Sequence, residues 1–131
     1  MTGLDTNILL RYFAQDDPVH SAIATRIIER QLSPEHPGFI SLVTLAEVVW
    51  TLTSKYGLSR SETARIVEVL ISAPNLAVQN EQEVAIAMSA LYDGEAFADA
   101  LIAALGTWAG CTSTLTFDRK ASRLPGFELI A

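Results

Sequence analysis

Short apolar segments alternate with longer segments of helical periodicity along this 131-residue chain. The short segments are typical of buried strands, and the longer ones are typical of helices. Strands that are separated by helices favour a parallel sheet with helices on both of its faces. The sequence therefore predicts an α/β fold, a three-layer α/β/α sandwich around a central parallel sheet of four to five strands. The expected strands cover residues 1–5, 39–40, 76–78, 111–115 and 127–130.

Capping residues and helix breakers set the expected helix boundaries. Ser41 can cap a helix that runs to about Tyr56 and stops at Gly57. A capping-box pattern at 59–62 opens a helix that Pro74 ends. The other expected helices cover 8–14, 17–32, 80–92 and 97–108. Residues 80–83 are expected to cap the helix that ends at 92, and one further helical turn is expected at 119–122.

Composition indicates a single folded domain over residues 1–131. Half of the residues are hydrophobic and 18% are charged, which excludes a disordered chain. The single cysteine, Cys111, excludes an internal disulfide and is expected to be a small core residue. The start of the chain lacks the pattern of a signal peptide, and the longest uncharged run, 100–117, is too rich in Gly, Ser and Thr for a membrane span. We therefore expect a cytoplasmic protein that is not attached to a membrane.

The charge balance at first argues against a nucleic-acid partner. The chain has 15 acidic and 9 basic residues, a formal net charge of −6, whereas phosphate binding usually needs a basic face. Two observations weaken this argument. A third of the basic charge lies within 119–123, and setting four carboxylates aside as metal ligands leaves 11 acidic against 9 basic residues, a balance of −2.

Four carboxylates stand in positions where polar side chains could meet. Asp5 and Asp118 each follow an expected strand, Glu47 lies on the helix after the second strand, and Asp99 opens a helix. Each also has an ordinary structural explanation. Asp5 and Asp118 can cap helices, and Glu47 can belong to a polar, solvent-exposed face of its helix. Asp99 can be an acid in the first turn of a helix that the helix dipole stabilises.

Taken together, the four acids could converge on one edge of the sheet, because sites in open parallel sheets form at the carboxyl ends of strands. Asp99 is the only charged residue between 96 and 117, and a lone charge in an apolar segment needs a partner. Each close pair of carboxylates would cost about 1–4 kcal/mol of repulsion, which a hard cation removes. Carboxylate oxygens suit Mg²⁺ or Mn²⁺.

At these residues the chain resembles PIN-domain ribonucleases, specifically VapC-type toxins of type II toxin–antitoxin systems. The resemblance implies a three-layer sandwich, usually a homodimer, that cuts RNA with Mg²⁺ or Mn²⁺ and is neutralised by a cognate antitoxin. It spans nearly the whole chain but does not name the RNA target. The segments that carry it are 4–12, 41–50, 97–102, 116–121 and 123–127.

The resemblance also implies roles for individual residues. The family's acidic quartet corresponds to Asp5, Glu47, Asp99 and Asp118. Three of them, Asp5, Asp99 and Asp118, would hold the metal, and Glu47 would orient the attacking water or hold a second ion. The expected supporting residues are Thr6, Asn7 and Thr116, which would fix the carboxylates, and Arg119 and Lys120, which would contact RNA phosphates or simply be solvated.

Two other functions fit parts of the pattern. A Mg²⁺-dependent phospho-aspartate transfer protein also places acids at strand ends, but the first strand here offers only Asp5, and the segment 76–80 ends without an acid. A non-catalytic interaction module could keep the same fold. The intact quartet argues against that module.

Overall fold

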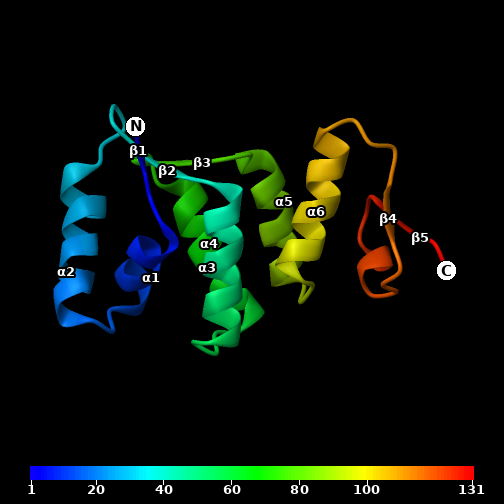
Figure 1. The fold of residues 1–131 in the computed structure, drawn as a ribbon, viewed down its shortest axis with the longest axis horizontal. Coiled ribbons are helices and arrows are strands. Elements are labelled where there is room, and N and C mark those ends of the chain that lie inside the picture. The colour runs from blue at the N-terminus through cyan, green and yellow to red at the C-terminus, as the bar shows by residue number, and fades with distance from the viewer.

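Five short strands and six α-helices alternate along the chain in the computed structural model, which describes residues 1–131 (Figure 1). This alternation and the parallel pairing of the strands confirm the α/β class. The strands are β1 (Thr2–Gly3), β2 (Gly38–Ile40), β3 (Leu76–Val78), β4 (Thr114–Thr116) and β5 (Phe127–Leu129). The helices are α1 (Thr6–Ala14), α2 (Pro18–Arg26), α3 (Leu42–Ser54), α4 (Arg60–Ser72), α5 (Glu81–Tyr92) and α6 (Phe97–Trp108), with a π-helical turn η1 (Ile27–Gln31) and a 3₁₀ turn η2 (Ala121–Arg123).

The five strands divide into two parallel sheets rather than one. One sheet has the order β1-β2-β3, and the other consists of β4 and β5 alone. Figure 1 shows β4 and β5 beyond α6, away from the three-stranded sheet. β4 passes close to α6 at Gly106, where a Cβ atom would lie only 2.5 Å from Thr114 Oγ1, so the approach requires a glycine.

The expected caps explain most of the helix boundaries. The Ser41 hydroxyl accepts from the Thr44 amide at the start of α3, and the capping box of Ser59 and Glu62 opens α4, as the sequence predicts. The expected cap at Asn80 is wrong. Its backbone is left-handed, with φ of 51°, and no side-chain cap forms at the start of α5.

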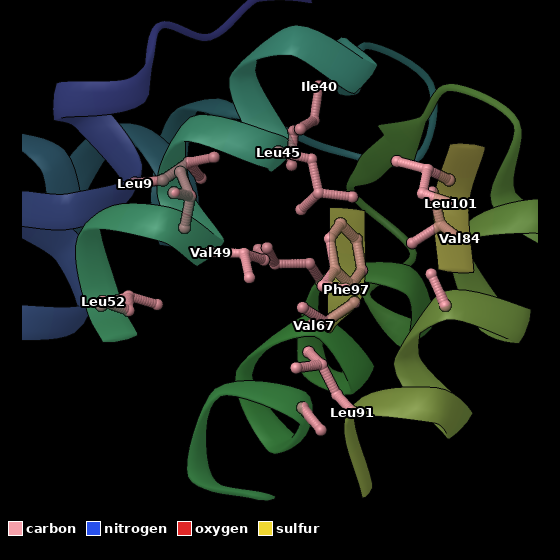
Figure 2. Packing of buried hydrophobic residues seen from close by; sticks show 14 of the residues in the cluster. Leu9, Ile40, Leu45, Val49, Leu52, Val67, Val84, Leu91, Phe97 and Leu101 are labelled. Atoms are coloured by element: carbon pink, nitrogen blue, oxygen red, sulfur yellow. The ribbon is translucent and has the colours of Figure 1, made fainter. Parts of the chain in front are cut away.

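The hydrophobic core lies between the three-stranded sheet and helices α1 and α3 to α6. Phe97 and Leu101 of α6 reach into it beside Val49 and Val84 (Figure 2). This core fixes α6 firmly to the first part of the chain. Its largest fully buried side chains are those of Leu9, Ile40, Leu45, Leu52, Leu70, Leu91, Val48, Val67, Val84 and Thr63.

The strand β4 is not buried, contrary to the sequence prediction for 111–115. Cys111 is exposed, Leu115 is 64% exposed and the neighbouring Phe117 is 80% exposed. The apolar sequence predicts a covered strand, but β4 pairs only with β5. None of the helices is both long and apolar enough to span a membrane.

The Asp16 carboxylate joins the end of α1 to the chain after α3. Its Oδ2 accepts a 2.8 Å hydrogen bond from the Tyr56 hydroxyl, and Arg11 Nη1 donates to its Oδ1 at 3.0 Å. The Tyr56 hydrogen bond, supported by Arg11, lowers the pKa of Asp16 below its ordinary value. This carboxylate therefore stabilises the fold above the unfolded-state pKa of about 4, and the contribution is lost as the pH falls through the lower folded-state pKa.

We expect Asp16→Asn to lower the free energy of unfolding at pH 7 and to lower it less at pH 3, because below about pH 4 the unfolded chain takes up a proton on Asp16 more readily than the folded protein does. Urea unfolding of both proteins at the two pH values measures this. The control is Asp93→Asn, since Asp93 forms no ion pair. An equal loss at both pH values contradicts the assignment.

Candidate active site

Asp5 and Glu47 lie next to each other in the fold through Thr6. Asp5 follows β1 and caps α1, where its Oδ1 accepts from the Thr6 amide at 2.7 Å. The Thr6 hydroxyl donates to Glu47 Oε1 on α3 at 2.9 Å. Both carboxylates are exposed. We call Asp5 and Glu47 the first half-site.

Asp99 and Asp118 line one small cavity of about 180 Å³. Asp99 lies in the first turn of α6, and Asp118 follows β4. Asp118 Oδ1 accepts from the Lys120 amide at 2.8 Å, and its own amide donates to Thr116 Oγ1 at 3.0 Å. Asp118 therefore caps the turn that follows it, as expected, and also lines the cavity. We call Asp99 and Asp118 the second half-site.

Three cationic side chains surround the second half-site. Arg60, Lys120 and Arg123 line the same cavity. Arg60 donates to the Gly94 carbonyl, and Arg123 pairs with Glu95 at 3.7 Å, so both are tied to the loop before α6. This combination suits a phosphate group, because the cations can hold the phosphate beside the two carboxylates.

The sequence pattern found only part of this cationic group. Lys120 lines the cavity as expected, whereas Arg119 is exposed and does not line it. Arg123 belongs to the basic segment 119–123, but no role at the site was predicted for it, and Arg60 was missed because no local motif marks it at the start of α4. Only the folding of those segments around the loop before α6 brings them together.

The two half-sites do not combine within the chain. No three His, Cys, Asp or Glu side chains lie close enough together to hold a metal ion. Carboxylates are suitable ligands for Mg²⁺ or Mn²⁺, but a single chain in this conformation does not bring three of the expected ligands to one ion. Asn7 lines a different cavity, beside Arg11 and His20.

The sequence matches a known protein family. The family model described as PIN domain matches residues 4–126, a span that contains both half-sites. The chain belongs to the PIN domain family. PIN domains are commonly nucleases and usually use divalent metals, so membership supports a nuclease-type, hydrolytic function for this PIN domain. No curated protein matches the chain.

Proposed function

We propose that this PIN domain is an endoribonuclease that hydrolyses RNA phosphodiester bonds with Mg²⁺ or Mn²⁺. The second half-site carries the proposal. There Asp99 and Asp118 share a cavity with three cations, an arrangement that suits the phosphate of a polyanionic substrate better than a small neutral ligand. The three cations offset the three acids that line this cavity, Glu95, Asp99 and Asp118, so the site is less acidic than the chain as a whole, whose net charge is −6.

We propose Asp5, Asp99 and Asp118 as the metal ligands. All three can bind one ion only if the first and second half-sites come together. Glu47 is already oriented by the Thr6 hydroxyl and belongs to the catalytic group in this proposal. The hydroxyl of Thr116 accepts from the Asp118 amide and so fixes the turn that presents this carboxylate. Lys120 is the cation best placed to contact an RNA phosphate, because Arg60 and Arg123 are already engaged.

We further propose that the protein is the toxin of a toxin–antitoxin pair, that a cognate antitoxin neutralises it, and that it acts on cytoplasmic RNA as a homodimer. This part is supported by the resemblance of 4–12, 41–50, 97–102 and 116–121 to VapC-type toxins.

The proposal is tested with purified protein and a 5′-labelled single-stranded RNA of mixed sequence. We expect internal cuts in the presence of Mg²⁺ or Mn²⁺, no cuts with a chelator, and recovery when the metal is restored. A matched single-stranded DNA distinguishes an RNA-specific nuclease from a general one. Intact RNA under all metal conditions contradicts the proposal.

One observation favours a second candidate, a non-catalytic PIN-fold interaction module. The two half-sites lie apart, and a non-catalytic module could keep them apart because it needs no metal ion bound by both. The same assay decides between them. A module would cut no RNA and would bind no Mn²⁺ through Asp5 or Asp99.

A further inference from the structure

A cavity that belongs to neither half-site lies between α1 and α2. Its volume is about 390 Å³. Figure 1 shows the two helices side by side at the N-terminal end of the fold. Ligand pockets commonly have volumes of about 300–1,000 Å³, so this cavity has room for a group the size of a nucleobase. Six residues line it: Asn7, Ile8, Arg11, His20, Ile23 and Ala24.

Three of the lining side chains are polar and the other three are apolar. The polar groups are an amide, a guanidinium and an imidazole, from Asn7, Arg11 and His20. A flat heterocycle suits such a lining, because its faces stack on other groups and its edges carry hydrogen-bonding atoms. No Asp or Glu lines the cavity, so no carboxylate in it repels the acceptor atoms of a base.

Arg11 is held in place and still has one free edge. Its Nη1 donates to both carboxylate oxygens of Asp16, at 3.0 and 3.1 Å, whereas its Nε and Nη2 make no hydrogen bond within the chain. These two nitrogens form one side of the planar guanidinium, which matches a pair of adjacent acceptors. Because Asp16 offsets the charge of Arg11 but leaves these donors free, a base edge suits the cavity better than a phosphate.

Guanine is the base whose edge matches the free side of Arg11. Its N7 and O6 atoms are adjacent acceptors, and an arginine that donates to both is the commonest base-specific contact. Adenine has a donor beside N7, so one N–H of the arginine would face another donor. Asn7 adds an amide that can both donate to a base and accept from it.

His20 supplies an aromatic face on the α2 side of the cavity. Its Nδ1 lies 3.3 Å from Asp17 Oδ2, which orients the imidazole. Asp17 is itself fixed as the cap of α2, where its side chain accepts from the Val19 and His20 amides. Aromatic side chains, histidine included, stack on unpaired RNA bases. The His20 side chain is 68% exposed, so a base can reach its ring.

The cavity also adjoins the first half-site. Asn7 follows Asp5 by two residues, and helix geometry separates the Cα atoms of such residues by about 5–6 Å. Arg11 comes one turn further along the same helix. An RNA strand that places a phosphate at Asp5 can therefore place a neighbouring base in the cavity.

We infer that the cavity between α1 and α2 binds one guanine base of the RNA substrate, close to the phosphate that is cut. Arg11 selects the base through N7 and O6, Asn7 contacts a further polar atom of the base, and His20 stacks on its face. Contacts to base edges are the ones that carry sequence information. The inference rests on the proposed nuclease function and adds a sequence preference to it.

The first test measures binding without cleavage. The wild-type protein, kept in a chelator, is titrated into fluorescently labelled hexauridylate in which one internal uridine is replaced by guanosine or by adenosine. We expect the guanosine RNA to bind about 5- to 150-fold more tightly than the adenosine RNA, the usual discrimination of a bidentate base contact. Equal affinity for the two RNAs overturns the inference.

Arg11→Lys isolates the contribution of the guanidinium. The lysine keeps a cation beside Asp16 but lacks the planar edge, so the preference for guanosine should disappear in a variant that a thermal melt shows to be folded. The matched control is Arg26→Lys, which should keep the preference, because Arg26 is exposed on α2 and does not line the cavity. A folded Arg11→Lys protein that still prefers guanosine overturns the inference.

His20→Ala separates stacking from base selection. Stacking depends little on which base is present, so this variant should bind the guanosine and adenosine RNAs more weakly by similar factors. The ratio of the two affinities should therefore stay near its wild-type value. Unchanged affinity for both RNAs overturns the stacking role of His20.

A cleavage assay separates this inference from the proposed function. The cut ends of a random-sequence RNA pool should carry guanine at one fixed position relative to the cut, and Arg11→Lys should abolish that enrichment. Cuts without a preferred base overturn the guanine cavity and leave the nuclease standing. Guanosine-dependent binding without any cut refutes the nuclease and leaves the base-binding cavity standing. Guanosine monophosphate that competes as well as the hexanucleotide overturns the role of the cavity in RNA binding.

Discussion

If Asp99 holds the metal as proposed, replacing it by asparagine should reduce RNA cleavage by at least about 100-fold, because loss of a metal ligand should cost more than the 10–100-fold typical of residues that only support one. The substitution keeps the size of the side chain. Asp99 lines the cavity of the second half-site and lies in the first turn of α6. Initial rates of cleavage of the labelled RNA, measured at saturating Mn²⁺, give the effect.

The matched control for this variant is Asp93→Asn. Asp93 is an exposed acid just before the loop that leads to α6, and it does not line the cavity of the second half-site. Its replacement removes the same charge and should leave the rate unchanged. A thermal melt shows whether Asp99→Asn is folded. If the folded Asp99→Asn protein cleaves at the wild-type rate, Asp99 has no catalytic role.

Phe97→Ala should lower the free energy of unfolding by about 3–5 kcal/mol, the usual cost of deleting a buried phenyl ring. Phe97 is 4% exposed and is the first residue of α6, where it packs into the core with Val49 and Leu91 nearby (Figure 2). Because the substitution leaves a cavity beneath the first turn of α6, it also loosens the turn that presents Asp99. Equilibrium unfolding in urea measures the loss.

The control on the same helix is Ile102→Ala. Ile102 is 52% exposed, so its truncation should cost less than about 1 kcal/mol. If Phe97→Ala costs no more than this control, α6 is not anchored by that ring. In that case the position of Asp99 in the first turn of α6 would not depend on the burial of Phe97.

The sequence predicted helix starts well where the capping interaction joins residues within one turn. The serine cap at Ser41 and the capping box at Ser59 depend only on groups within one turn, and both form. Asn80 failed because its backbone is left-handed, with φ of 51°, whereas the side-chain oxygen of an N-cap residue reaches the first amides of the helix from an extended backbone. Its side-chain Nδ2 instead donates to Glu83 Oε1.

Burial could not be predicted in the same way. The segment 111–115 has the composition of a covered strand, yet Leu115 is 64% exposed, because β4 pairs only with β5. Contacts between residues far apart in the chain decide whether an apolar strand is covered, and no periodicity records them. The place of Arg60 and Arg123 at the cavity was not predicted for the same reason.

By itself the sequence determined the order of strands and helices, the helix caps, and the placement of four acids near strand ends or helix starts, since each depends on residues close together in the chain. The tertiary structure decided how those acids group. It joined Glu47 to Asp5 through Thr6, placed Asp99 and Asp118 at one cavity, and kept the two pairs apart. The physical reason is that this grouping depends on contacts between residues far apart in the chain, such as the burial of Phe97 and Leu101 in the core, which local sequence patterns do not encode.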